Sequence, residues 1–142
     1  MQYRLGTPNA ALLVLITLIL VLASASAQSN YKTLYRFTGV ADGDYPAWGV
    51  IFDQAGILYG TAAWGGNLNY CTSNGLSGGC GVVFKLVPNS KGGWNEIVLH
   101  RFAHHPGAHP VFGVIFGAGG NLYGTTQGDG VTTFGSVFEI TS

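Results

Sequence analysis

An internal repeat constrains this chain more than any other feature of its sequence. The tetrapeptide Leu-Tyr-Gly-Thr occupies Leu58–Thr61 and returns 64 positions later at Leu122–Thr125. The preceding Gly-Val-Ile-Phe, at Gly49–Phe52, returns at the same offset as Gly113–Phe116. Self-similarity at a fixed period is the signature of a repeat architecture. The sequence therefore predicts two copies of one structural unit, and by itself it says little about chemistry.

The first copy carries an insertion that the second copy lacks. Phe84 matches Phe138 at an offset of 54, so the first copy holds ten extra residues between the Leu-Tyr-Gly-Thr box and this position. Cys71 and Cys80, the only cysteines, lie inside the insertion. In an exported chain we expect them to form one disulfide. A metal site is the alternative, but no partner ligand lies nearby in the sequence.

The N-terminus has the three parts of a secretory signal peptide. Arg4 gives a positive charge, Ala10–Ala23 is an almost unbroken apolar run, and Ala25–Ala27 has the small-x-small pattern that signal peptidase cleaves. We expect residues 1–27 to be removed, so that the mature chain is secreted, periplasmic or extracellular and makes no membrane contact. The alternative is an uncleaved anchor, although a spanning helix takes about 20 apolar residues and this run is shorter.

The composition indicates a folded β protein. Charged residues make up 8% of the chain and aromatic residues 13%, which is the reverse of the balance found in disordered chains. The 23 glycines, together with β-branched and aromatic residues, favour strands joined by tight turns. The formal net charge is zero, so the sequence has no electrostatic footprint for nucleic acid.

Short apolar runs alternate with turn residues along the mature chain, and no helical periodicity follows the leader. We therefore predict an all-β fold of two four-stranded antiparallel meander repeats, each like a β-propeller blade, after an N-terminal signal helix. Repeat 1 is expected over residues 28–93, with a disulfide loop at 64–80, and repeat 2 over residues 94–142. The predicted strands are 33–37, 49–53, 57–62 and 81–87, then 96–102, 113–116, 121–127 and 135–140.

Positions shared by both copies are expected to form the core of each repeat. Glycine in the middle of a strand normally weakens a sheet, so its recurrence in the box predicts close approach by an aromatic ring or another backbone. The expected core positions are Leu58, Tyr59, Gly60, Thr61 and Phe84 in the first copy, and Leu122, Tyr123, Gly124, Thr125 and Phe138 in the second.

The motif spacing resembles the GloVer-type tandem repeat of secreted bacterial β-repeat proteins of the choice-of-anchor kind. The resemblance rests on Gly-x-Leu-Tyr-Gly-Thr at Gly56–Thr61 and Gly120–Thr125, each followed by Gly-x-Val-Phe-x-Leu/Ile at Gly81–Leu86 and Gly135–Ile140. It implies an extracellular, propeller-like array and transfers no catalytic residue. Members of the family typically hold many copies and often end in a surface-sorting signal, whereas this sequence shows two copies and no such anchor.

A propeller needs roughly four to eight blades to close, and two blades leave a sheet face open at each end. The sequence leaves three alternatives. Several chains assemble into a ring, the two sheets pack as a small sandwich, or the sequence is a fragment of a longer array.

Candidate catalytic carboxylates fall in turns. Asp42 and Asp44 lie in a glycine-containing turn and Asp53 follows a strand. Aspartate is common in turns because its side chain accepts hydrogen bonds from the nearby backbone, so we favour this interpretation over an acid/base or calcium role.

Histidines cluster at His100, His104, His105 and His109. Such a cluster can bind a transition metal, but adjacent histidines in an extended segment point apart. We therefore expect no functional metal site and no cofactor.

Trp64 and Tyr70 in the insertion are the best candidates for stacking on sugar rings, although aromatic residues more often fill β cores. The favoured function is a secreted, non-catalytic β-repeat module, structural or ligand-binding, whose partner is an envelope glycan or further copies of itself. The alternatives are an extracellular polysaccharide-active enzyme and a truncated fragment of a longer propeller array.

Overall fold

The computed structural model describes residues 30–73, 76–104, 107–128 and 134–141. The chain separates into two units, Met1–Lys32 and Thr33–Ser142, and the following description concerns the second. The predicted signal peptide at residues 1–27 lies outside the described residues. Within the described part, no helix is long and apolar enough to cross a membrane.

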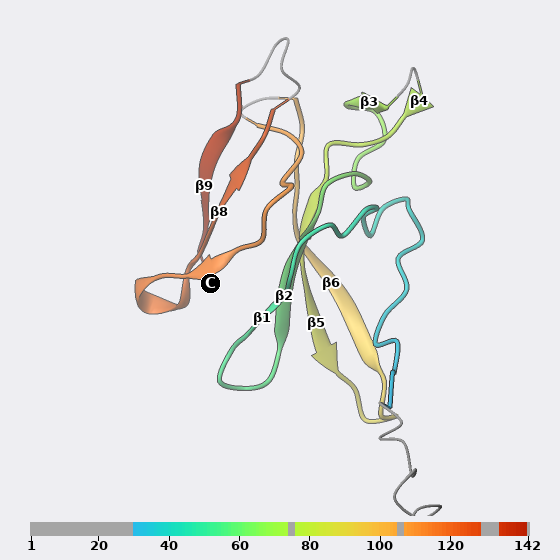
Figure 1. The fold of residues 1–142 in the computed structure, drawn as a ribbon, viewed down its shortest axis with the longest axis vertical. Coiled ribbons are helices and arrows are strands. Elements are labelled where there is room, and N and C mark those ends of the chain that lie inside the picture. Colours follow the sequence, from blue (N-terminus) through green and yellow to red (C-terminus); the bar gives the residue numbers. More distant parts are fainter. Residues whose placement is uncertain (1–29, 74–75, 105–106, 129–133, 142) are drawn as a thin grey trace, which may run out of the picture. The chain divides into compact units, whose positions relative to one another are not determined.

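Four antiparallel strands make the first sheet, in the order β1-β2-β5-β6 (Figure 1). They are β1 (Ile51–Phe52), β2 (Leu58–Ala62), β5 (Val82–Pro88) and β6 (Trp94–Arg101). Each strand of this sheet pairs with the next one in the sequence, except that a further segment lies between β2 and its partner β5. That segment holds a separate two-stranded hairpin, β3 (Thr72–Ser73) with β4 (Leu76–Ser77), inside the predicted disulfide loop.

Three antiparallel strands make the second sheet, in the order β7-β8-β9. They are β7 (Ile115–Phe116), β8 (Leu122–Thr126) and β9 (Ser136–Ile140), drawn in orange to red in Figure 1. A 3-10 turn, η1 (Ala118–Gly120), joins β7 to β8. The described residues thus form an all-β fold with two main antiparallel sheets, as the sequence predicts.

Strand pairing follows one pattern in both sheets. In the first, Ile51 lies opposite Tyr59 and Gly60 opposite Phe84. In the second, Ile115 lies opposite Tyr123 and Gly124 opposite Phe138. Every one of these residues in the second sheet is the sequence match of its counterpart in the first.

Two strands predicted from the sequence are placed differently. Residues 33–37 form no strand. β6, predicted to open the second copy, is instead the outermost strand of the first sheet. The reason is the turn before β6, where Asn89 Oδ1 accepts hydrogen bonds from Lys91 N at 3.1 Å and Gly93 N at 3.0 Å and folds β6 back beside β5. The second sheet consequently has three strands and not the predicted four.

A phenylalanine ring covers the central glycine of each sheet. A Cβ on Gly60 would lie 2.7 Å from Phe84 Cζ, and a Cβ on Gly124 would collide with the Phe138 ring. The close aromatic approach predicted for these two glycines is confirmed.

Both faces of the first sheet carry buried apolar side chains. On one face, Leu58, Ala62, Val82, Phe84 and Leu86 form a cluster that Tyr35, Phe37, Trp94 and Val98 cover. On the other face, Val83 belongs to a buried cluster that includes Leu122 of the second sheet and Val114, just before β7. The two sheets therefore meet face to face, which explains why their strands are apolar on both sides.

Candidate functional site

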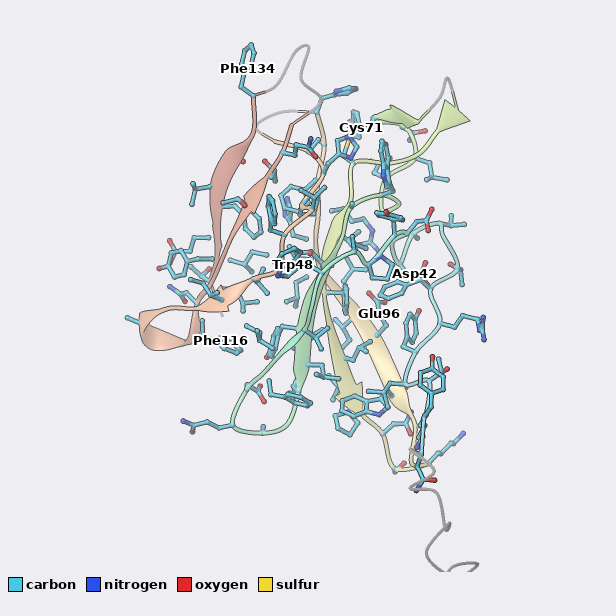
Figure 2. The ribbon with its side chains drawn as sticks, viewed as in Figure 1. Asp42, Trp48, Cys71, Glu96, Phe116 and Phe134 are labelled. Carbon is cyan, nitrogen blue, oxygen red and sulfur yellow. A yellow bond between two sulfur atoms is a disulfide. The ribbon has the colours of Figure 1, made fainter. Side chains whose placement is uncertain are left out.

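The contact between the two sheets, here called the junction, combines apolar packing with specific polar contacts. Thr61 Oγ1 donates a hydrogen bond to the Phe112 carbonyl oxygen at 2.9 Å. The Tyr59 and Phe116 rings meet edge to face, with centroids 5.2 Å apart. Trp48 lies at the margin of the junction, with its ring centroid 5.3 Å from that of Phe112 (Figure 2).

Residues on the first-sheet side of the junction have exposed counterparts in the second sheet. Val83 is 0% exposed, whereas its match Val137 is 78% exposed. Thr61 is 3% exposed, and its match Thr125 is exposed. We call the surface made by Ile115, Tyr123, Thr125 and Val137 the outer face. A groove of about 250 Å³ crosses it, lined by these residues with Gly113 and Gly124.

Residues on the second-sheet side of the junction also have exposed counterparts, in the first sheet. Val114 is 3% exposed, whereas its match Val50 is 47% exposed. Trp48 and Phe52, the matches of Phe112 and Phe116, are large apolar side chains that are also exposed. We call the surface made by Trp48, Val50 and Phe52 the leading face. Trp48 also contacts Phe112 within the chain, so the leading face adjoins the margin of the junction. The chain therefore presents a second copy of each side of its own junction.

A pocket of about 380 Å³ runs along β9. Residues Ser136–Ile140 line it on one side, and His100–Ala103 with Gly107 on the other. In the first sheet, the counterparts Phe84 and Leu86 are buried in a cluster that Trp94 and Val98 of β6 cover. Among the described residues no fourth strand pairs with β9, and the pocket lies along this strand.

Cys71 and Cys80 form the predicted disulfide, with their Cα atoms 5.2 Å apart. Both cysteines are buried and belong to the same apolar cluster as Val83 and Val114. The insertion is thus fastened to the core between the sheets.

The two predicted sugar-stacking residues differ in their surroundings. Trp64 is half-buried, and its ring lies tilted against that of His109 with centroids 4.1 Å apart. Tyr70 is exposed. Of the pair, Tyr70 is therefore the one whose ring is available to a ligand.

Two of the clustered histidines have structural roles. His109 is buried, and its Nδ1 lies 3.0 Å from the Ala63 carbonyl oxygen, so this nitrogen carries the proton that it donates. His104 Nε2 accepts a hydrogen bond from Cys71 N at 3.3 Å. His105 lies outside the described residues. Among the residues that are described, no three metal-binding side chains come together.

Asp42 and Asp53 hold turns together. Asp42 accepts hydrogen bonds from Thr38 N and Thr38 Oγ1 and from the Tyr35 hydroxyl. Asp53 accepts them from Ala55 N at 2.9 Å, Ile57 N at 2.8 Å and the Tyr59 hydroxyl at 3.1 Å. Asp44 Oδ1 accepts one from Tyr45 N at 2.7 Å. These side chains serve the turns in which they lie, as their sequence context predicts.

Asp42 and Glu96 are neighbours with opposite pKa shifts (Figure 2). Burial acts to raise the pKa of Asp42, but the hydrogen bonds from Thr38 and Tyr35 outweigh it and lower the pKa. Burial, and then the charge of Asp42, raise the pKa of Glu96, while Arg101 opposes them. Burial and Asp42 also raise the pKa of Tyr35 to about 12. Glu96 Oε1 is buried without a hydrogen-bond partner in the described structure.

Sequence reasoning missed the exposed position of Val50 and the buried Oε1 of Glu96. The 64-residue offset that pairs Leu58 with Leu122 also pairs Trp48 with Phe112, so the repeat itself could have identified the leading face. Nothing in the sequence marks the half-buried carboxyl group of Glu96. Comparisons of the chain with protein-family models, curated proteins and solved structures gave no match.

Proposed function

We propose that this chain is a non-catalytic β-repeat module of the cell exterior, built from two blade-like copies of the GloVer type, and that it works by presenting binding surfaces. The predicted signal peptide and the sequence resemblance support the location and the family. The disulfide is of the kind that persists in oxidising compartments. The common pairing pattern of the two sheets supports the two-copy organisation.

One observation carries the proposal. The chain exposes apolar and aromatic side chains on two sheet faces, while Asp42 and Asp53 are occupied by turn hydrogen bonds. Contiguous exposed apolar patches on folded proteins mark interaction sites. The hydrogen bonds to Asp42 lower its pKa and hold it in its ionised form, so it is poorly suited to donate a proton to a substrate.

An envelope glycan is the proposed ligand class, because exposed aromatic rings stack on sugar rings. Tyr70 in the insertion is the residue proposed to make that contact. The test is retention of the purified chain on a panel of insoluble cell-wall polysaccharides, with product release measured in the same samples. The proposal expects retention without product release, and expects Tyr70→Ala to weaken retention severalfold. Phe134→Ala, at another exposed aromatic residue, is the matched control and should leave retention unchanged (Figure 2).

An extracellular enzyme acting on polysaccharide is the second candidate, and one observation favours it. Asp42 and Glu96 form a carboxyl pair whose pKa values move apart, which is the arrangement that separates a base from an acid. Product release that disappears in both Asp42→Asn and Glu96→Gln, with folding intact, would replace the non-catalytic proposal by this one. Retention without release would reject the enzyme.

A further inference from the structure

The outer face and the leading face match the two sides of the junction residue by residue. Thr61 on one side bonds the carbonyl of Phe112 on the other. Their counterparts are Thr125 on the outer face and Trp48 on the leading face, and both faces are open. The chain thus holds both halves of a second junction, while Val83 and Val114 are already buried in the first one.

The other contacts of the junction also have matching residue pairs on the outer face and the leading face. Val83 and Val114 lie in one buried cluster, and Tyr59 meets the Phe116 ring. The matching pairs on the open faces are Val137 with Val50 and Tyr123 with Phe52. All four members of these pairs retain the residue type of their counterparts.

The free edge of β9 also has a matching segment. Leu99–Phe102 (Leu-His-Arg-Phe) spans the end of β6 and the residue after it and leads into the second sheet, where Phe102 packs on Phe138 with centroids 5.1 Å apart. Leu34–Phe37 (Leu-Tyr-Arg-Phe) leads into the first sheet, where Phe37 packs on Phe84 at 4.9 Å. The two segments have equivalent positions at the entry to a sheet.

The two segments differ in their strand pairing. β6 is paired with β5, with Val83 opposite His100. Leu34–Phe37 forms no strand, and β9, the counterpart of β5, is an edge strand with a pocket of about 380 Å³ beside it. An unpaired edge is a template for a strand from another chain. Applied to β9, the register of β5 and β6 places Val137 opposite Tyr35 of a second copy.

We propose that a second copy of this chain docks head to tail on the second sheet. Its leading face covers the outer face of the first copy, and its Leu34–Phe37 segment completes the sheet as a fourth strand on β9. This interface joins two different surfaces, so it propagates until a ring closes. A ring of roughly four to eight blades takes two to four chains. The inference rests on the two-copy organisation put forward above.

The test is the solution mass of the chain from Gln28 onward, measured by light scattering across a range of concentrations. The expected result is one discrete species of two to four chains. Val137→Glu on the outer face and Phe52→Glu on the leading face should each reduce the mass to that of a single chain. Ser90→Glu, in the exposed β5–β6 turn, adds the same charge away from both faces and should leave the assembly intact.

Mixing the two interface variants separates head-to-tail docking from a symmetric contact. Each variant keeps the face that the other has lost, so an equal mixture should form a dimer that grows no further. If the mixture stays monomeric while circular dichroism shows both variants folded, the proposed interface is wrong. A parent chain that is monomeric at all concentrations also overturns it. Retention on polysaccharide without product release is measured independently. The proposed binding function can therefore be supported even if the proposed assembly is rejected.

Discussion

Phe84 on β5 lies directly opposite Gly60 on the neighbouring strand β2, and its ring fills the space that a side chain at position 60 would need. A Cβ on Gly60 would come within 2.7 Å of Phe84 Cζ. The second sheet repeats the arrangement with Gly124 and Phe138. The glycine in the Leu-Tyr-Gly-Thr box is therefore a packing requirement of the ring opposite, since neither glycine has a positive φ angle.

Gly60→Ala should destabilise the fold by about 1–3 kcal/mol, because the added methyl group overpacks a closed site. Gly49→Ala is the control, as a Cβ there has open space within 4 Å. Urea unfolding measures both. The Gly60→Ala/Phe84→Leu double mutant should lose less stability than the sum of the two single losses, because the smaller side chain makes room for the added methyl group. Losses that simply add would contradict the account.

Phe84→Ala should cost about 3–5 kcal/mol, because the ring is 2% exposed and its removal leaves a cavity. Phe138→Ala should cost less in the dissociated chain, because Phe138 is half-buried and lines the pocket along β9. Urea unfolding at low protein concentration compares the two. Equal losses would show that β9 is as well covered as β5.

The sequence predicts the repeat-based features of this fold and misses those that depend on pairing partners. The box positions, the aromatic cover over both glycines and the disulfide all follow from matched spacing. The placement of β6 does not, because Leu99–Phe102 and Leu34–Phe37 are near-identical in sequence and only one has a strand beside it within the chain. The ring contact between Trp64 and His109 joins residues 45 positions apart that no motif connects.

The disulfide should contribute about 2–3 kcal/mol, the amount expected for closing a loop of this length. The Cys71→Ser/Cys80→Ser variant should therefore melt at a lower temperature than the parent chain. Adding a thiol reductant should lower the melting temperature of the parent toward that of the variant. If reductant lowers the melting temperature of the variant equally, the effect does not come from this bridge.

Glu96 should make the fold less stable as the pH rises. Its pKa is raised in the folded state by burial and by Asp42, so the unfolded chain releases this proton at a lower pH than the folded chain. Stability is then lost as the pH climbs from the ordinary glutamate pKa through the raised one. Glu96→Gln should melt at a higher temperature than the parent at neutral pH, and the difference should vanish at acid pH.

Glu139→Gln is the control for that comparison. Glu139 is an exposed carboxylate that accepts hydrogen bonds from Tyr123 and Asn121. Its substitution should produce no gain in melting temperature at neutral pH. A gain of the same size in both variants would mean that loss of negative charge, and not burial of Glu96, is responsible.

Asp42 should have the opposite pH dependence. Its pKa is lowered in the folded state because the hydrogen bonds from Thr38 and Tyr35 outweigh burial. The stability it contributes is therefore present above the ordinary aspartate pKa and is lost as the pH falls through the lowered one. Asp42→Asn should reduce the melting temperature at neutral pH, with the loss shrinking in acid; a constant loss at every pH would contradict this assignment.

Hydrogen exchange along β9, followed as the chain is diluted, tests the central claim most directly. β5 is paired on both sides within one chain, whereas β9 pairs with β8 alone in the part of the chain that the structure describes. We predict that peptides covering β9 are protected at high protein concentration and exchange much faster on dilution, while peptides covering β5 stay protected throughout. Protection of β9 that equals that of β5 in a demonstrated monomer would show that the edge is already covered and would contradict the account.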